Sequence, residues 1–279
     1  MRVLVMLDGT LADADAPLIR VDDLGLMRGD GVFETVLVAD GKPRELGPHL
    51  DRLARSAAML GLPVPDRAAW ERCVALVLAN WPGGEMALKL VYTRGPEFGD
   101  GSPTGFALGM PISPKVLAAR AGGVAAVTLE RGYDPSIVER APWLLLGAKS
   151  LSYAVNMAAL RHAESVGAAE VIFVAADESV LEGPTSTVVV VSGRTLRTTP
   201  PSSGILRGTT QGALFRAAEH AGWATKVEPL TLDELRTADA LFLASSVRKL
   251  TRVHTLDGVV LPASAELHDE LNALYESEY

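Results

Sequence analysis

The chain has 279 residues, of which 48% are hydrophobic and 22% are charged, and its formal net charge is −8. A typical single domain has roughly 100–150 residues, so this length predicts two domains. The acidic balance argues against nucleic-acid binding through a general basic field. No apolar run is long enough for a signal peptide or a membrane span, which favours a cytoplasmic protein with no membrane partner.

The only cysteine, Cys73, lies in an apolar run with helical spacing. We therefore expect a buried, unreactive thiol. A single cysteine also excludes an intrachain disulfide, as is usual in a reducing cytosol.

The first part of the chain carries mainly strand signals. Apolar and β-branched runs predict strands, and Asp40-Gly41 between two of them indicates a hairpin. Apolar residues at helical spacing predict two helices, one opened by Pro48 and closed by Gly61, the other capped by Asp66. The predicted elements are strands at 1–7, 32–39, 86–92 and 106–110, and helices at 48–60 and after 66.

Residues 111–121, with two prolines, are predicted to form a linker. We place the domain boundary near residue 115, between a small α/β domain (1–115) and a larger domain (116–279). In the second part helices alternate with strands, and some strands form hairpins, which predicts a mixed sheet. The predicted elements are strands at 124–129, 170–175, 186–191, 241–244 and 250–255, and helices at 150–166 and 209–221.

Several common catalytic motifs are absent. There is no P-loop, no G-x-G-x-x-G after a strand and no G-x-S-x-G, and the five histidines lack metal-ligand spacing. The sequence therefore does not favour a nucleotide-binding enzyme, a zinc enzyme or a serine hydrolase.

Lys149 follows the apolar run Trp143 to Leu146 and precedes the predicted helix at 150–166. An amine in such a place is partly desolvated, which lowers its pKa and makes it a usable nucleophile or base. The alternative is a lysine that extends from a helix N-terminus into solvent.

Four further features could support an anionic, ring-bearing cofactor. Glu182 lies at a strand end, where a carboxylate could pair with a pyridinium nitrogen. The Gly-bounded loop 203–210 opens a helix whose amides could hold a phosphate. Ser245 and Ser246 add hydroxyls at another strand end, and Arg52 adds a cation. Each feature alone is equally compatible with an ordinary turn, cap or surface residue.

Taken together and in this order, six segments resemble the class IV enzymes that use pyridoxal phosphate (PLP). These enzymes include branched-chain aminotransferases, D-amino-acid aminotransferases and 4-amino-4-deoxychorismate lyases. The matching segments are Arg28 to Thr35, His49 to Leu53, Lys149 to Ser152, Leu181 to Ser186, Gly204 to Gly208 and Ala244 to Ser246.

The resemblance implies a two-domain α/β (α+β) fold of PLP fold type IV, like that of D-amino-acid aminotransferases, with PLP between the domains. It also implies a homodimer. Lys149 would be the Schiff-base lysine and Glu182 the partner of the pyridine nitrogen. The phosphate would be held by Arg52, by the backbone of Ile205 and Leu206, and by Ser246 beside Ser245. Tyr153 resembles a cofactor-proximal tyrosine that the family places a few residues after the lysine.

Across the whole chain the closest likeness is to bacterial aminodeoxychorismate lyases, which form 4-aminobenzoate and pyruvate for folate synthesis. Arg94, Thr35 and Arg28 are the expected substrate-side residues, although Arg94 is equally compatible with a structural loop arginine. D-amino-acid aminotransferases are the first alternative. Those enzymes carry an Arg-x-His pair soon after an Arg-Gly, and no such pair follows Arg94-Gly95 here. They also usually have a tyrosine where this chain has Phe33. A PLP-binding protein without activity is a lesser alternative.

Overall fold

The computed structural model describes all residues, Met1–Tyr279, and the chain divides into two units. The first unit comprises Met1–Ser113 together with Ala148–Tyr153. The second comprises Pro114–Gly147 and Ala154–Tyr279. The division at Ser113 lies close to the boundary predicted near residue 115, but the return of 148–153 to the first unit was not foreseen.

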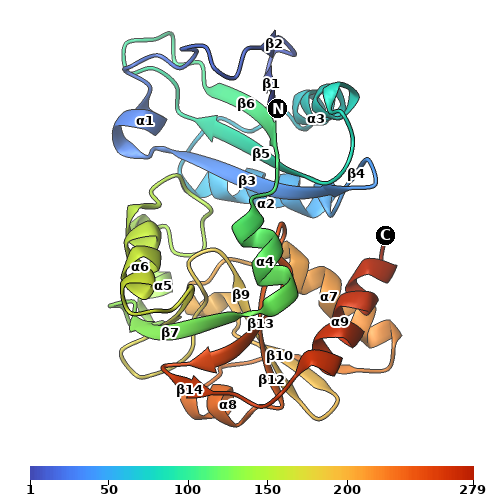
Figure 1. Cartoon of the computed structure of the whole chain (residues 1–279). Helices are drawn as coiled ribbons and strands as arrows, with labels where there is room; N and C mark the ends of the chain where they lie inside the picture. Colours follow the sequence, from blue (N-terminus) through green and yellow to red (C-terminus); the bar gives the residue numbers. More distant parts are fainter. The chain divides into compact units, whose positions relative to one another are not determined.

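The first unit is built on a six-stranded antiparallel sheet in the order β2-β1-β6-β5-β3-β4 (Figure 1). Its strands are β1 (Val3–Met6), β2 (Leu11–Ala12), β3 (Gly31–Ala39), β4 (Lys42–Pro43), β5 (Met86–Thr93) and β6 (Thr104–Met110). Its helices are α1 (Leu24–Arg28), α2 (Leu46–Met59) and α3 (Arg67–Asn80). The predicted strands and the hairpin at Asp40-Gly41 are therefore confirmed.

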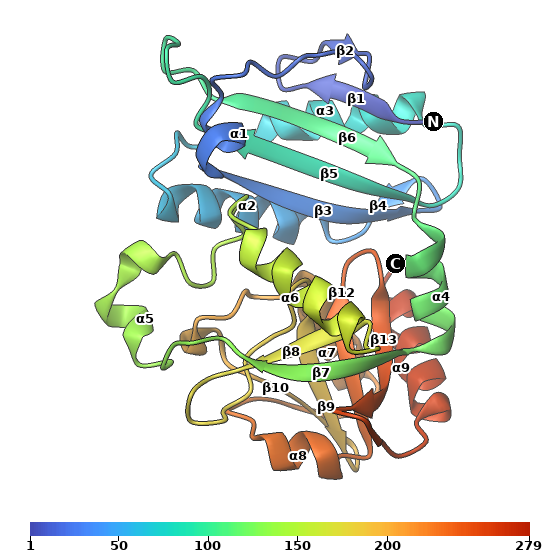
Figure 2. The same cartoon turned by 60° about the vertical axis from the view of Figure 1, so that its left-hand side comes forward.

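Helices α2 and α3 cover one face of this sheet (Figure 2). Leu53 of α2 and Trp70 of α3 are fully buried against alternate residues of β3 and β5. Asp66 caps α3 as predicted, because its side chain accepts hydrogen bonds from the amides of Ala68 and Ala69. Cys73 is buried in the same core, as expected.

The segment around Lys149 pairs antiparallel with β3 through an isolated bridge between Val32 and Ser150. The amide of Phe33 donates to the carbonyl of Lys149 at 3.0 Å, and the amide of Leu151 donates to the carbonyl of Gly31 at 2.8 Å. The helix predicted from residue 150 is thus wrong at its start, since the observed helix, α6 (Ala154–Ser165), begins only at Ala154. Pairing with β3 occupies the backbone groups that a helix at 150 would need.

The second unit contains an eight-stranded mixed sheet in the order β11-β10-β9-β12-β13-β7-β8, with β14 paired to β13. Three neighbouring pairs are parallel and the others are antiparallel, as the alternation in the sequence predicted. The strands are β7 (Val124–Glu130), β8 (Glu170–Val174), β9 (Thr187–Ser192), β10 (Thr195–Thr198), β11 (Ala224–Val227), β12 (Ala240–Ser245), β13 (Lys249–Leu256) and β14 (Val259–Val260).

Helices cover both faces of this second sheet. Val189 and Val191 of β9 pack with α7 (Thr209–His220) and α9 (Ala265–Ser277). Val188 and Val190 pack on the other face with Leu235 of α8 (Leu232–Thr237). A strand covered on both faces reads as a continuous apolar run, which explains its sequence. The α-helices are α4 (Pro114–Gly122), α5 (Ile137–Arg140), α6 (Ala154–Ser165), α7 (Thr209–His220), α8 (Leu232–Thr237) and α9 (Ala265–Ser277).

The predicted linker at 111–121 is largely wrong, because α4 occupies Pro114–Gly122. Proline is tolerated in the first turn of a helix, where its missing N–H leaves no bond unmade. The Ala- and Arg-rich residues that follow favour a helix. No helix of the structure has both the length and the apolar character needed to cross a membrane.

Replacing Gly31 with alanine should loosen the strand that carries Lys149. A Cβ at residue 31 would lie 2.8 Å from both Leu151 Cδ1 and the Tyr92 carbonyl oxygen, so the segment must shift. We expect faster hydrogen exchange at the Leu151 amide and a lower Tm. Gly47→Ala is the control, since its Cβ would meet only Arg67 Nη2 at 3.5 Å. Unchanged exchange at Leu151 in the Gly31 variant would contradict this description of the pairing.

Candidate active site

The amine of Lys149 lies against an aromatic wall in the first unit. Its Nζ is 4.6 Å from the ring centroid of Phe33, a distance typical of cation–π contacts. The ring of Tyr153 meets Phe33 edge-on, with centroids 5.3 Å apart and an interplanar angle of 84°. The backbone of Lys149 is fixed by its pairing with β3 and by a bond from its amide to Ser56 Oγ at 3.1 Å. Lys149 is therefore a positioned amine rather than a lysine that extends freely into solvent.

The opposite face of β3 carries a buried ionic cluster of Glu34, His49 and Arg52. Arg52 donates from Nε to Glu34 Oε1 at 2.8 Å and from Nη2 to Oε2 at 2.7 Å. His49 Nδ1 lies 2.7 Å from the same Oε2. All three side chains are buried. Two parallel hydrogen bonds to one carboxylate fix the plane of the Arg52 guanidinium, which suits an arginine that orients an anion.

Burial alone would raise the pKa of Glu34, but the positive charge of Arg52 and the hydrogen bonds from Arg52 and His49 lower it to about 2. Burial lowers the pKa of His49 and outweighs its hydrogen bond to Glu34. Glu34 is therefore ionised and His49 neutral at neutral pH. The sequence indicated Arg52 through its motif, but Glu34 was not singled out, because its partner His49 is fifteen residues away.

Glu182 lies in the second unit, in the segment between β8 and β9. Its Oε2 accepts a hydrogen bond from the amide of Leu206 at 3.1 Å. In this structure the Leu206 amide, which the resemblance assigns to the phosphate, is bonded to this carboxylate. Ile205 is almost fully buried. The backbone of Gly147 lies so close to it that a Cβ added at residue 147 would be 3.1 Å from the Ile205 carbonyl oxygen.

The start of α7 offers a better set of amides for a phosphate. Gly208 caps this twelve-residue helix without a side-chain bond, and the buried residues Thr209 and Thr210 follow it. The first amides of a helix point outward along its axis and favour an anion. A Cβ at Gly208 would lie 2.4 Å from Thr187 Oγ1, so glycine permits this approach of α7 to β9.

Tyr133 is a neighbour of Glu182 that the sequence did not indicate, because no motif surrounds it. Its hydroxyl donates to the carbonyl of Ser203 at 3.4 Å. Burial and the nearby charge of Glu182 raise the pKa of Tyr133 to about 12, so its hydroxyl stays protonated at neutral pH. The tyrosine therefore supports the loop that leads into residues 204–206.

Ser245 and Ser246 lie at the turn between β12 and β13, and Arg248 fixes this turn. The guanidinium of Arg248 donates to Ser245 Oγ at 3.4 Å and to Thr185 Oγ1 at 2.7 Å, and it forms an ion pair with Glu170. One arginine therefore links the serine turn to the segment that follows Glu182. Arg248 was also missed from the sequence, since its partners are distant along the chain.

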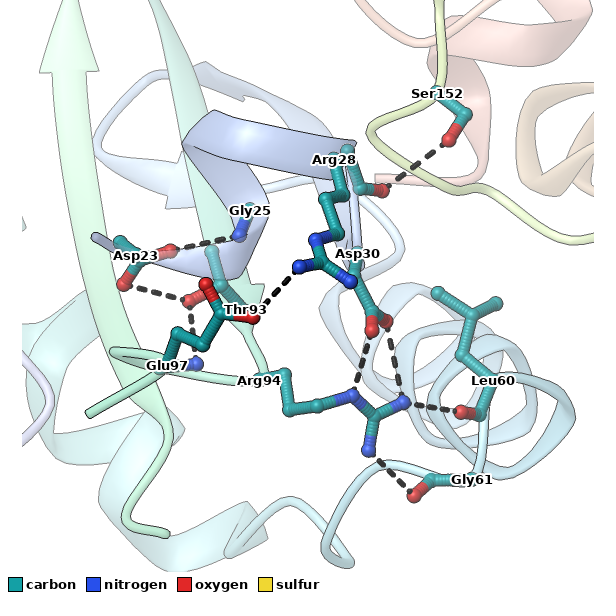
Figure 3. Close-up of polar contacts among 12 residues, drawn as sticks. Asp23, Gly25, Arg28, Asp30, Leu60, Gly61, Thr93, Arg94, Glu97 and Ser152 are labelled. Atoms are coloured by element: carbon teal, nitrogen blue, oxygen red, sulfur yellow. Dashed lines mark hydrogen bonds and ion pairs between the residues drawn. The ribbon is translucent and has the colours of Figure 1, made fainter. Parts of the chain in front are cut away.

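Both expected substrate-side arginines, Arg94 and Arg28, are engaged in structural ion pairs (Figure 3). Arg94 binds both oxygens of Asp30, at 2.6 and 3.2 Å, and donates to the carbonyls of Leu60 and Gly61. Arg28 is paired with Glu97 at 2.6 Å. The expectation that Arg94 binds a substrate carboxylate is therefore not supported by its contacts.

These side chains and amides fit the chemistry of PLP. The amine of Lys149 matches an aldehyde, and the carboxylate of Glu182 matches a pyridinium. The buried guanidinium of Arg52 and the N-terminus of α7 both match a phosphate. Arg52, Lys149 and Tyr153 belong to the first unit, and Glu182, Leu206 and Ser246 belong to the second.

Changing Glu34 to glutamine should lower stability and flatten its pH dependence. The ionised carboxylate stabilises the fold above its ordinary pKa of 4.5, and this stabilisation is lost as the pH falls toward 2. His49 is neutral in the fold but takes up a proton in the unfolded chain below about pH 6.5, so it also lowers the stability of the fold as the pH falls. In urea titrations we expect the variant to lose roughly 3–5 kcal/mol at pH 7, because Arg52 keeps a buried charge without its counter-ion.

Asp51→Asn is the control, because Asp51 pairs with Arg67 on the exposed surface of the same helix. We expect a loss of at most about 1 kcal/mol there. Equal, small losses in both variants, with parallel pH profiles, would show that the Glu34 cluster does not hold the fold.

The family model for amino-transferase class IV matches residues 31–256. A bifunctional aminodeoxychorismate lyase / D-amino acid transaminase of Mycobacterium tuberculosis is 44% identical over 281 residues, covering 96% of this chain and 97% of that protein. A PLP-bound structure described as a hypothetical aminotransferase from Mycobacterium tuberculosis aligns with a TM-score of 0.95 and 44% identity over the whole of both chains. The 4-amino-4-deoxychorismate lyase structure from Pseudomonas aeruginosa aligns with a TM-score of 0.79 and 28% identity, covering 94% of this chain and 96% of that one.

The match covers most of the chain, and the fold is that of the fold-type IV transaminases. This chain belongs to the class IV aminotransferase family, whose cofactor is pyridoxal phosphate.

Proposed function

We propose that this enzyme is an aminodeoxychorismate lyase, which converts 4-amino-4-deoxychorismate to 4-aminobenzoate and pyruvate. The observation that carries the proposal is the full-length, 44% identity to a bifunctional relative with this lyase activity in its name. The sequence adds support, because the Arg-x-His pair with which D-amino-acid aminotransferases hold a substrate carboxylate is missing after Arg94-Gly95, and Arg94 itself is bonded to Asp30.

In this proposal Lys149 binds the cofactor and Glu182 pairs with the nitrogen of its ring. Arg52, the first amides of α7 at Thr209 and Thr210, and Ser246 hold its phosphate. Glu34 and His49 act through Arg52 and fix the direction in which its guanidinium points. We also propose that the chain forms a homodimer, as the family resemblance implies.

When bound, pyridoxal phosphate withdraws electrons from the substrate carbon that carries the amino group. The amine of Lys149 takes the proton from that carbon. The ring carbon–oxygen bond to the enolpyruvyl group then breaks, and the ring becomes aromatic. A proton delivered from Lys149, or from water that it positions, to the methylene carbon converts the departing enol to pyruvate. Atoms balance without a co-substrate, and the residues mainly orient groups and stabilise charge.

D-amino-acid transamination is the second candidate activity. It is favoured by the same relative, whose name contains both activities. The two reactions share the first steps, in which an amine reaches the cofactor and Lys149 removes a proton. A transaminase must then return the amino group to a keto acid, whereas a lyase needs no acceptor.

The proposal predicts many turnovers on 4-amino-4-deoxychorismate without any keto acid. Pyruvate and 4-aminobenzoate should form in equal amounts and in excess over enzyme, because the amine leaves with the aromatic product. D-alanine without an acceptor should give at most one equivalent of pyruvate per site. If aminodeoxychorismate is not consumed while D-alanine and 2-oxoglutarate react rapidly, the transaminase alternative replaces the lyase.

A further inference from the structure

Lys89 places a second ammonium group beside the ring that Lys149 touches. Its Nζ is 5.2 Å from the centroid of the Phe33 ring, against 4.6 Å for Lys149. Lys89 lies on β5, directly opposite Thr35 of β3. Lys149 lies on the other side of β3, in the segment that pairs with Gly31 and Phe33. The strands that carry the two amines therefore flank the strand that carries the ring.

The position of Lys89 on the sheet follows from strand alternation. Val36 and Leu88 point into the core under α2 and α3, so their neighbours Thr35 and Lys89 point to the opposite face, with Phe33. Both Thr35 and Lys89 are only half-buried. Directly opposed residues of neighbouring antiparallel strands have Cβ atoms about 4.5–5.5 Å apart, so both side chains can reach one ligand.

Lys89 has no acidic partner, whereas each of the nearby arginines has one. Arg28 is paired with Glu97, Arg94 with Asp30 and Arg52 with Glu34. The ammonium of Lys89 forms no hydrogen bond or ion pair, and its contact is the face of Phe33. The ammonium groups of Lys89 and Lys149 repel each other beside one ring. An anion bound next to Lys89 would reduce this repulsion.

We propose that Lys89 binds a carboxylate of the substrate, with the hydroxyl of Thr35 as a second donor, and thereby selects amines that carry a carboxylate away from the reacting carbon. The inference rests on the proposed lyase function and deepens it. 4-Amino-4-deoxychorismate has two carboxylates, and neither is attached to the carbon that bears its amine. Its amine goes to the site of Lys149 while a carboxylate is held by Lys89. Lys89 is thus a specificity residue that does not take part in proton transfer.

The test compares Lys89→Met with the parent enzyme and with Lys89→Arg, all loaded with PLP. A charge-assisted carboxylate bond predicts a roughly ten- to hundred-fold higher KM for aminodeoxychorismate in Lys89→Met, with kcat within a few-fold. Chorismate carries the same two carboxylates without the amine, so its dissociation constant, measured by titration, should rise by the same factor. Lys89→Arg should recover most of both. The half-reaction with D-alanine, whose carboxylate adjoins its amine, should change far less.

Lys42→Met is the matched control, because Lys42 is an exposed lysine of β4 at the far end of β3. It should leave KM and chorismate affinity unchanged. If Lys89→Met fails to fold, as judged by its Tm and its cofactor absorption, Lys89→Gln takes its place in the same titrations.

The outcomes separate this inference from the proposed function. A parent enzyme that does not consume aminodeoxychorismate overturns both. A parent that consumes it, with KM and chorismate affinity unchanged in Lys89→Met, overturns only the assignment of Lys89. An equal loss for D-alanine and chorismate would also overturn it, because Lys89 would then act on the whole site and not on the remote carboxylate.

Discussion

The pairing of residues 149–151 with β3 is the constraint on which the candidate site depends. Two backbone hydrogen bonds join this segment to Gly31 and Phe33, although the chain before and after it belongs to the second unit. These bonds fix the backbone of Lys149 beside β3, and from there its amine reaches the Phe33 ring. The close approach also explains the glycine at position 31, where a Cβ would meet Leu151.

Consecutive residues of β3 point to opposite faces of the sheet and have different surroundings there. Glu34 points toward α2 and holds Arg52 and His49 in a buried ionic cluster, whereas Phe33 and Thr35 point to the face of Lys149 and Lys89. Because strand side chains alternate, a shift of one residue would exchange these environments and bury the wrong groups. The apolar neighbours of Glu34 on the α2 face, which include Val32 and Val36, make that shift costly.

Local patterns predicted most elements of the fold, and long-range pairing accounts for most of the misses. The Asp40-Gly41 hairpin, the Asp66 cap and the apolar run of β9 are local signals, and each is confirmed. The helix predicted at residue 150 begins at Ala154, because β3 takes the backbone of the segment before it.

Within the candidate site, motifs indicated Lys149, Glu182 and Arg52, whose roles remain proposals. Lys89, Glu34 and Arg248 could not be found from the sequence, since each depends on partners that only the folded sheets bring near.

Borohydride reduction of the PLP-loaded protein, followed by peptide mass spectrometry, tests the central claim that Lys149 carries the cofactor. The account predicts one modified peptide, with the reduced cofactor on Lys149 and none on Lys89, although both amines lie beside Phe33. Modification of Lys89 or of any other lysine in place of Lys149 would contradict it.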